Sequence, residues 1–86
     1  MENERLISLR KQAGITQQGL ADAIGISQSM VALIESGQRE PRKKIRIELV
    51  RFFSKTLSRP EPITVEWLFY ESEYNQQSSM PDSKTA

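Results

Sequence analysis

Cysteine and histidine are both missing from this chain of 86 residues. Without them the chain forms no disulfide, has no cysteine nucleophile and lacks the thiolate and imidazole ligands of a zinc site. General acid–base catalysis would then depend on a carboxylate or a lysine whose pKa is shifted by burial, and so short a chain has little volume for a closed pocket. We therefore expect no enzyme activity, metal, cofactor or small-molecule ligand.

Long apolar runs are missing as well. The longest run, Met30 to Ile34, has five residues, whereas crossing a bilayer takes roughly 20. Charged side chains also interrupt the N-terminal segment, which therefore does not have the pattern of a secretory signal; they are Glu2, Glu4, Arg5, Arg10 and Lys11. We expect no membrane contact and a cytoplasmic location.

Charge is unevenly distributed along the chain, although the total is only +1. Residues 1–59 contain 11 Lys and Arg against 6 Asp and Glu, a net of +5, whereas residues 60–86 contain one Lys against five acidic residues, a net of −4. Five basic residues form one cluster, which consists of Arg39, Arg42, Lys43, Lys44 and Arg46. Such a cluster is either a solvated helix face or a contact for a polyanion.

Apolar residues recur at intervals of three and four, which is the spacing of amphipathic helices rather than of strands. Glycines able to adopt a positive φ mark helix ends, and Thr or Ser oxygens mark the starts that follow. These signals predict an all-α fold of five short helices. The first ends at Gly14, the second runs from Thr16 to Gly25, the third from Ser27 to Ser36, the fourth follows Pro41 and covers about 42–55, and the last follows Thr64.

The C-terminal segment has a different composition from the rest. Residues 72–86 are rich in Ser, Gln, Asn, Lys and Pro, and Tyr74 and Met80 are their only large apolar groups. Such a segment cannot bury enough surface to offset the entropy of ordering it. We therefore expect one domain over residues 1–71 and a disordered tail over residues 72–86.

A turn of about three residues joins the second and third expected helices, which together span residues 17–36. Two short helices connected in this way are organised as a helix-turn-helix. In that motif one helix crosses the DNA backbone while the other, here residues 27–36, lies in the major groove. Their steep crossing angle requires a small residue such as Ala21 and a glycine turn such as Gly25.

A longer pattern surrounds this unit. It comprises the opening from Arg5-Leu6 to Arg10, then Thr16-Gln17, Gln17-x-x-Leu20-Ala21-x-x-x-Gly25-Ile26-Ser27, Val31, Ile34-Glu35-x-Gly37 and Pro41. Through these residues the segment 5–53 resembles the phage-repressor and Cro-like helix-turn-helix family, also called the xenobiotic-response-element (XRE) family. The resemblance implies a lambda-repressor-like fold of five helices, sequence-specific binding to double-stranded DNA as a homodimer, and transcriptional repression, frequently in phages and mobile elements.

The same resemblance implies a set of DNA contacts. The outward face of the third helix would meet the bases through Gln28, Ser29, Ala32 and Leu33. A glutamine amide bonds N7 and N6 of adenine, and Ala or Leu can meet a thymine methyl group; the alternative for Gln28 is an ordinary exposed helix residue. Phosphates would be held by Gln17, Gln18, Ser27, Arg39, Arg42, Lys43 and Lys44, with a solvated surface as the alternative for the four cations.

Two further roles follow from the resemblance. Arg10 and Glu35 resemble the family's buried ion pair between the first and third helices, which is structural and makes no base contact. In the last helix, Trp67 is expected in the core, and the expected dimer contacts are Leu68, Phe69 and Tyr70.

Three features depart from the family's pattern. The groove-facing side carries no Lys or Arg, and Met30 and Leu33, neighbours at a spacing of three, either read methyl groups or form a protein-binding patch. Gly19 lies inside the second helix, where glycine costs about 1 kcal/mol relative to alanine. The connector 55–63 is longer than the short turn that the family usually has there, and we expect it to reposition the last helix.

These observations predict a homodimeric transcriptional repressor that binds a palindromic operator. The alternative is a protein-interaction module, such as an antitoxin or a repressor-binding partner, that uses Met30, Leu33 and the aromatic last helix. A DNA-binding repressor would bind random duplex weakly, and this binding would fall as salt rises, whereas a protein-interaction module would not bind random duplex.

Overall fold

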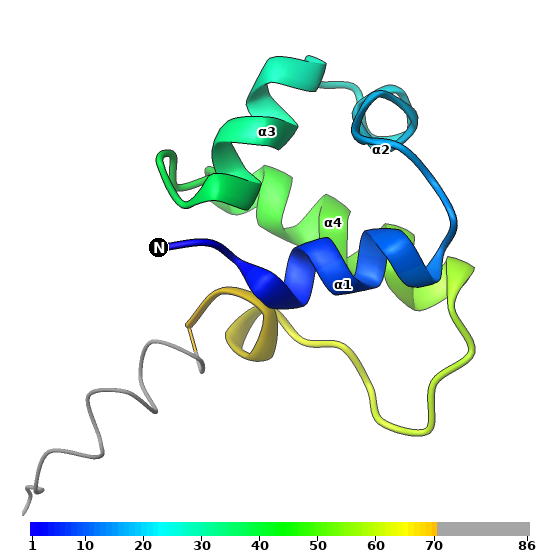
Figure 1. Cartoon of the computed structure of the whole chain (residues 1–86). Coiled ribbons are helices and arrows are strands. Elements are labelled where there is room, and N and C mark those ends of the chain that lie inside the picture. The colour runs from blue at the N-terminus through cyan, green and yellow to red at the C-terminus, as the bar shows by residue number, and fades with distance from the viewer. Residues whose placement is uncertain (71–86) are drawn as a thin grey trace, which may run out of the picture.

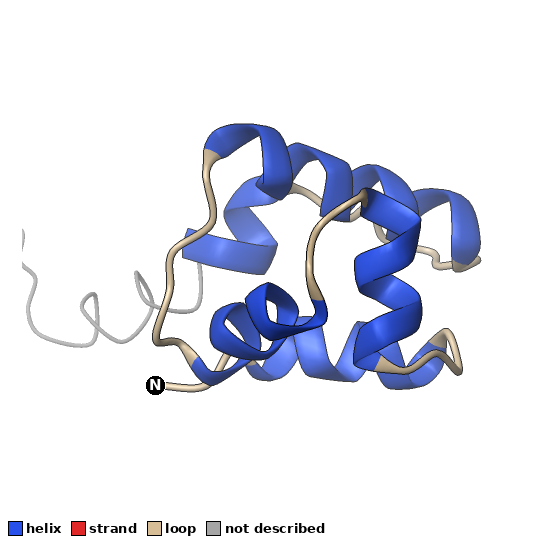
Figure 2. Ribbon diagram, turned by 90° about the horizontal axis from the view of Figure 1, so that it is seen from above, coloured by secondary structure: helices blue, strands red, loops and turns tan. Residues whose placement is uncertain are grey.

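The computed structural model describes residues 1–70, which fold into five helices with no strand among them (Figures 1 and 2). In chain order these are α1 (Glu4–Gln12), α2 (Gln17–Ile24), α3 (Gln28–Ser36), α4 (Lys43–Thr56) and the short π-helix η1 (Glu66–Tyr70). The all-α prediction is therefore confirmed. The expected tail, residues 72–86, lies outside the described residues. Within residues 1–70, no helix is both long and apolar enough to cross a membrane.

Side-chain oxygens begin the first three helices. Thr16 and Ser27 each accept a hydrogen bond from the backbone N–H three residues later, at 2.9 and 3.1 Å, and so begin α2 and α3. Asn3 begins α1 in the same way, because its Oδ1 accepts from Leu6 N at 3.0 Å. Each bond satisfies an amide that the first turn of a helix leaves unpaired. The caps of α2 and α3 lie where the sequence predicts them, whereas the cap at Asn3 was not predicted.

Glycines end two of the helices, and a residue with extended backbone, Leu57, ends α4. Gly25 and Gly37 both have φ of +80° and end α2 and α3. The fourth helix begins slightly later than Pro41 suggests, since Arg42 is the N-cap and Lys43 the first helical residue. Pro41 is buried just before the helix, and its carbonyl accepts a hydrogen bond from Arg46 Nη1.

All five helices and the connector contribute to one hydrophobic core. Its members are Leu6, Leu9, Leu20, Ala21, Val31, Ile34, Leu49, Phe53, Ile63 and Leu68. Within each α-helix these residues are one, three or four positions apart, so that each helix turns one stripe inward. The chain from the connector returns across α1, and η1 comes to lie beside the start of that helix (Figure 1).

The N-terminal segment packs against the end of α3. Asn3 N donates to Glu35 O at 2.8 Å, and a Cβ placed on Gly37 would lie 1.7 Å from the carbonyl oxygen of Met1. Gly37 is therefore required twice, for its positive φ and for the close approach of another backbone.

We expect Gly37→Ala to destabilise the domain by at least about 1–2 kcal/mol from the φ alone, with a further loss from displacing Met1. The matched control is Gly19→Ala, because Gly19 is helical and a Cβ there would meet Thr16 Oγ1 at an ordinary 3.4 Å. Gly19→Ala should stabilise by about 0.5–1 kcal/mol. Urea unfolding of both variants measures the difference, and equal stabilities would contradict this account of Gly37.

Candidate nucleic-acid interface

The outward face of α3 carries the four residues expected to contact bases. Val31, Ile34 and Glu35 are buried against the core. On the other side of the helix, Ser29 is exposed, while Gln28, Ala32 and Leu33 are half-buried. Spacings of one and four residues place these four side chains on one helix face. The structure therefore brings them together, and their contact with bases stays a prediction.

The turn between α2 and α3 has the geometry that a helix-turn-helix needs. Both Gly25 N and Ile26 N donate to Ala21 O, at 2.8 and 3.0 Å, so the chain reverses within one residue of the end of α2. Ala21 itself is fully buried, which lets α3 cross close to α2. In Figure 1, α2 is seen nearly end-on while α3 runs across the view, which shows the steep angle between them.

A chain of polar side chains connects α1, α2 and α3. Arg10 Nε lies 2.6 Å from Glu35 Oε2, and its Nη1 donates to the carbonyl of Ile15 at 2.9 Å. Gln17 Nε2 donates to Glu35 Oε1 at 3.0 Å, and Gln28 Nε2 donates to Gln17 Oε1 at 2.6 Å. The expected ion pair is thus present, and a network extends from it to the first residue of α3.

This network changes the role expected for the side chain of Gln17. One N–H of its amide donates to Glu35 and its Oε1 accepts from Gln28, which leaves the second N–H as the one donor it can offer a phosphate, and that contact stays a prediction. The same bonds hold the Gln28 amide in one orientation. Because an amide has two N–H groups and one oxygen, Gln28 keeps one donor and its Oε1 for a ligand. Those are the two groups with which a glutamine pairs adenine.

The two remaining polar candidates for phosphate contact lie at the starts of α2 and α3. Ser27 is exposed, and its Oγ accepts from the α3 backbone, which leaves the hydroxyl hydrogen available to donate. Gln18 is also exposed, but its Nε2 donates to Asp22 Oδ1 at 2.8 Å. Their contact with phosphate stays a prediction.

The basic cluster divides into an outward and an inward part. Four members of the cluster have exposed side chains that form no ion pair within residues 1–70; these are Arg39, Arg42, Lys43 and Lys44. Arg46 turns inward, where its guanidinium lies 5.3 Å from the centre of the Tyr70 ring. The first turn of α4 has no acidic residue, so Lys43 and Lys44 place positive charge at the positive end of a helix dipole, which is unfavourable by about 0.3–1 kcal/mol each. A phosphate beside them would offset that cost.

Comparison with known proteins agrees with this geometry. Residues 6–59, more than half of the chain, match the family described as Helix-turn-helix. The chain belongs to the XRE-type helix-turn-helix family. It is also similar to an uncharacterized HTH-type transcriptional regulator of Haemophilus influenzae, with 40% identity over 55 residues that cover 64% of this chain and 56% of the relative. This chain thus matches little more than half the length of that curated relative. No solved structure matches the chain.

The last helix of this XRE-type domain differs from its expected role at two positions. Leu68 is 1% exposed within the protomer's own core, so its side chain cannot also form a dimer contact, and that expectation is wrong. Phe69 is half-buried against the core and Tyr70 is 36% exposed, so these two retain accessible surface. Trp67 lies at the edge of the core rather than inside it, with the guanidinium carbons of Arg5 and Arg59 at 4.6 and 4.8 Å from its ring centre.

Met30 and Leu33, the apolar pair on α3, are both half-buried, and whether they form a contact patch stays open. Met30 packs against the hydrophobic core, and Leu33 is itself half-buried. Neither is among the large hydrophobic side chains that are exposed within residues 1–70, which are Met1 and Tyr70.

Removing Arg10 should show how much the buried ion pair contributes to stability. Glu35 has a side-chain exposure of 5%, and stranding such a charge costs about 3–5 kcal/mol. We expect Arg10→Met to lose that much in urea unfolding, and a further Glu35→Gln change to recover part of it, because a neutral amide is cheaper to bury.

The control for Arg10→Met is Glu48→Ala. Glu48 pairs with Arg51 at 4.0 Å, and the two side chains are 41% and 71% exposed, so the loss should stay below about 1 kcal/mol. Similar losses for Arg10→Met and Glu48→Ala would contradict the structural role of the buried pair.

Proposed function

We propose that this chain is a sequence-specific DNA-binding transcription regulator that places α3 in the major groove. The observation that carries the proposal is the half-buried Gln28 amide at the start of α3, which Gln17 holds by one hydrogen bond and which keeps one donor and its Oε1 unused, on a helix whose other end leads into the exposed cations. Membership of the XRE-type helix-turn-helix family supports it, and so does the similarity to the Haemophilus influenzae HTH-type transcriptional regulator. A family of DNA regulators also argues against an enzyme.

Base recognition is assigned to the outward face of α3. Gln28 pairs with adenine through one N–H and Oε1, while Ser29 donates or accepts and so discriminates less. Ala32 and Leu33 contact thymine methyl groups. No arginine or lysine lies on this face, so the selected sequence should depend on adenine and thymine contacts rather than on a bidentate guanine contact.

Phosphate binding is assigned to the exposed polar groups on either side of α3. Ser27 and Gln18 lie at the starts of α3 and α2, and the four cations Arg39, Arg42, Lys43 and Lys44 lie in and after the loop that follows α3. If each subunit neutralises about two to four phosphates, the log affinity of a dimer falls with log salt at a slope of about −4 to −7.

We further propose a homodimeric repressor that binds a palindrome with half-sites about one helical turn, roughly 34 Å, apart. The accessible surfaces of Phe69 and Tyr70 provide the dimer contact, without Leu68. An interaction module on the same scaffold is the alternative; it is less well supported, because both comparisons point to a helix-turn-helix regulator and Met30 is only partly accessible.

Selection of bound fragments from a random duplex pool tests the function directly. A shared sequence arranged as an inverted repeat is the expected result, and it reports affinity, symmetry and half-site spacing together. Recovery of fragments without any shared sequence would contradict sequence-specific binding.

Two substitutions separate base recognition from phosphate binding on the selected site. Gln28→Ala should weaken that site by about 1–3 kcal/mol and leave binding to random duplex nearly unchanged, because only the base contact is lost. Lys43→Ala is the matched control and should weaken both duplexes and reduce the salt slope. Equal losses on both duplexes for Gln28→Ala would refute its role as a base reader. Titrations monitored by fluorescence anisotropy at several salt concentrations measure all of these quantities.

A further inference from the structure

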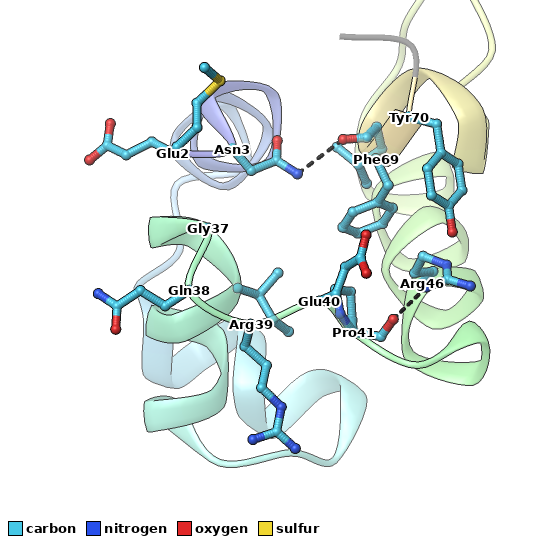
Figure 3. Close-up of a pocket in the computed structure, with 13 residues that line it drawn as sticks. Glu2, Asn3, Gly37, Gln38, Arg39, Glu40, Pro41, Arg46, Phe69 and Tyr70 are labelled. Carbon is cyan, nitrogen blue, oxygen red and sulfur yellow. Dashed lines mark hydrogen bonds between the residues drawn. The ribbon is translucent and has the colours of Figure 1, made fainter. Parts of the chain in front are cut away.

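Asn3 joins α1, α3 and η1 through its side chain and its backbone N–H. Its Oδ1 accepts from Leu6 N and caps α1, while its backbone N–H donates to Glu35 O at the end of α3, at 2.8 Å. Its Nδ2 donates to Leu68 O in η1, at 3.0 Å, across 65 residues of chain. Figure 3 shows this amide pointing from the N-terminal segment to the last helix.

The η1 helix depends on contacts of this kind for its orientation. It has five residues, too few to hold a helical conformation by its own hydrogen bonds. Its final carbonyls need donors from elsewhere. Asn3 supplies one to Leu68 O, and Arg5 Nη1 supplies one to Trp67 O at 2.7 Å while its guanidinium lies over the Trp67 ring.

An open cleft beside η1, which Asn3 lines together with Phe69 and Tyr70, makes these bonds more important. The cleft has a volume of about 370 Å³ and separates Phe69 and Tyr70 from the loop 37–41 (Figure 3). Leu68 fixes where η1 sits, because its side chain is in the core. Trp67 and Phe69 on either side of it pack only partly against the core, and the directional bonds that Asn3 and Arg5 donate to Leu68 O and Trp67 O add the constraint on the angle of η1.

We propose that Asn3 is a positioning residue that fixes the orientation of η1 relative to the recognition helix α3. This inference rests on the proposed function, in which η1 carries the dimer contact and α3 reads the half-site. In a dimer the angle between those two elements sets the distance and the rotation between the two copies of α3. Asn3 therefore acts on the spacing between half-sites that the dimer accepts, without touching DNA.

The substitution Asn3→Ser isolates the bond to η1. Serine is as good an N-cap as asparagine, so the start of α1 is kept. The bond from the backbone of residue 3 to Glu35 is also kept. Only the bond to Leu68 O is lost, because the serine side chain is too short to reach it. Gln12→Ala is the matched control, since Gln12 is an exposed residue of α1 whose side chain bonds only Ser8.

The experiment compares DNA duplexes that carry the selected half-site. One duplex has a single half-site, and the others have an inverted repeat with the centre-to-centre spacing changed in steps of one base pair around about 10. We expect wild type and Gln12→Ala to lose about tenfold in affinity one base pair away from the best spacing, because each step rotates the half-sites relative to each other. Asn3→Ser should lose only about threefold or less there, with single-site affinity within about twofold of wild type.

Three other outcomes overturn the inference, and each does so differently. An Asn3→Ser spacing profile identical to that of wild type shows that Asn3 is only a helix cap. An equal loss on the single half-site and on every repeat shows that it acts through α3 alone. A wild-type protein with no spacing preference shows that the dimeric part of the proposed function fails, and the inference falls with it.

Discussion

The Glu35 carboxylate is buried on the inner side of α3, and its burial constrains how the first three helices pack together. A carboxylate with 5% exposure is tolerated only where donors surround it, and here they come from two other helices: Arg10 in α1, which forms two bonds to it, and Gln17 in α2. The arrangement of α1, α2 and α3 is therefore constrained by electrostatics as well as by the apolar core. Since Gln28 is bonded to Gln17 in turn, the same constraint reaches the surface that faces the groove.

The basic side chains near the start of α4 fall into two groups. Lys43 and Lys44 stand at the positive end of α4 with no nearby carboxylate in its first turn, whereas Arg46, one turn later, is held by Pro41 and Tyr70. The domain thus separates cations that serve its own packing from cations that remain for an external anion. Linear sequence places all of them in one cluster, and what distinguishes Arg46 is its bond to Pro41 O and its contact with the Tyr70 ring.

Those parts of the structure that depend on neighbours in the chain are predictable from the sequence. Thr16, Ser27 and Gly25 act on backbone groups within a few residues, so the caps and turn of the helix-turn-helix follow from local chemistry. The bond from Asn3 to Leu68 and the burial of Leu68 were missed, because both depend on the path of the connector 55–63, which two prolines extend but do not direct. The Gln17–Gln28 bond depends on the crossing angle of two helices, which no local signal specifies.

The placement of Trp67 has a consequence for spectroscopy. It is the single tryptophan of the chain, and its ring lies at the edge of the core in contact with the guanidinium groups of Arg5 and Arg59. Its emission therefore reports whether the last helix is seated on the first, and not whether the helix-turn-helix itself is intact. Fluorescence and circular dichroism followed together would distinguish undocking of the C-terminal element from melting of the whole domain.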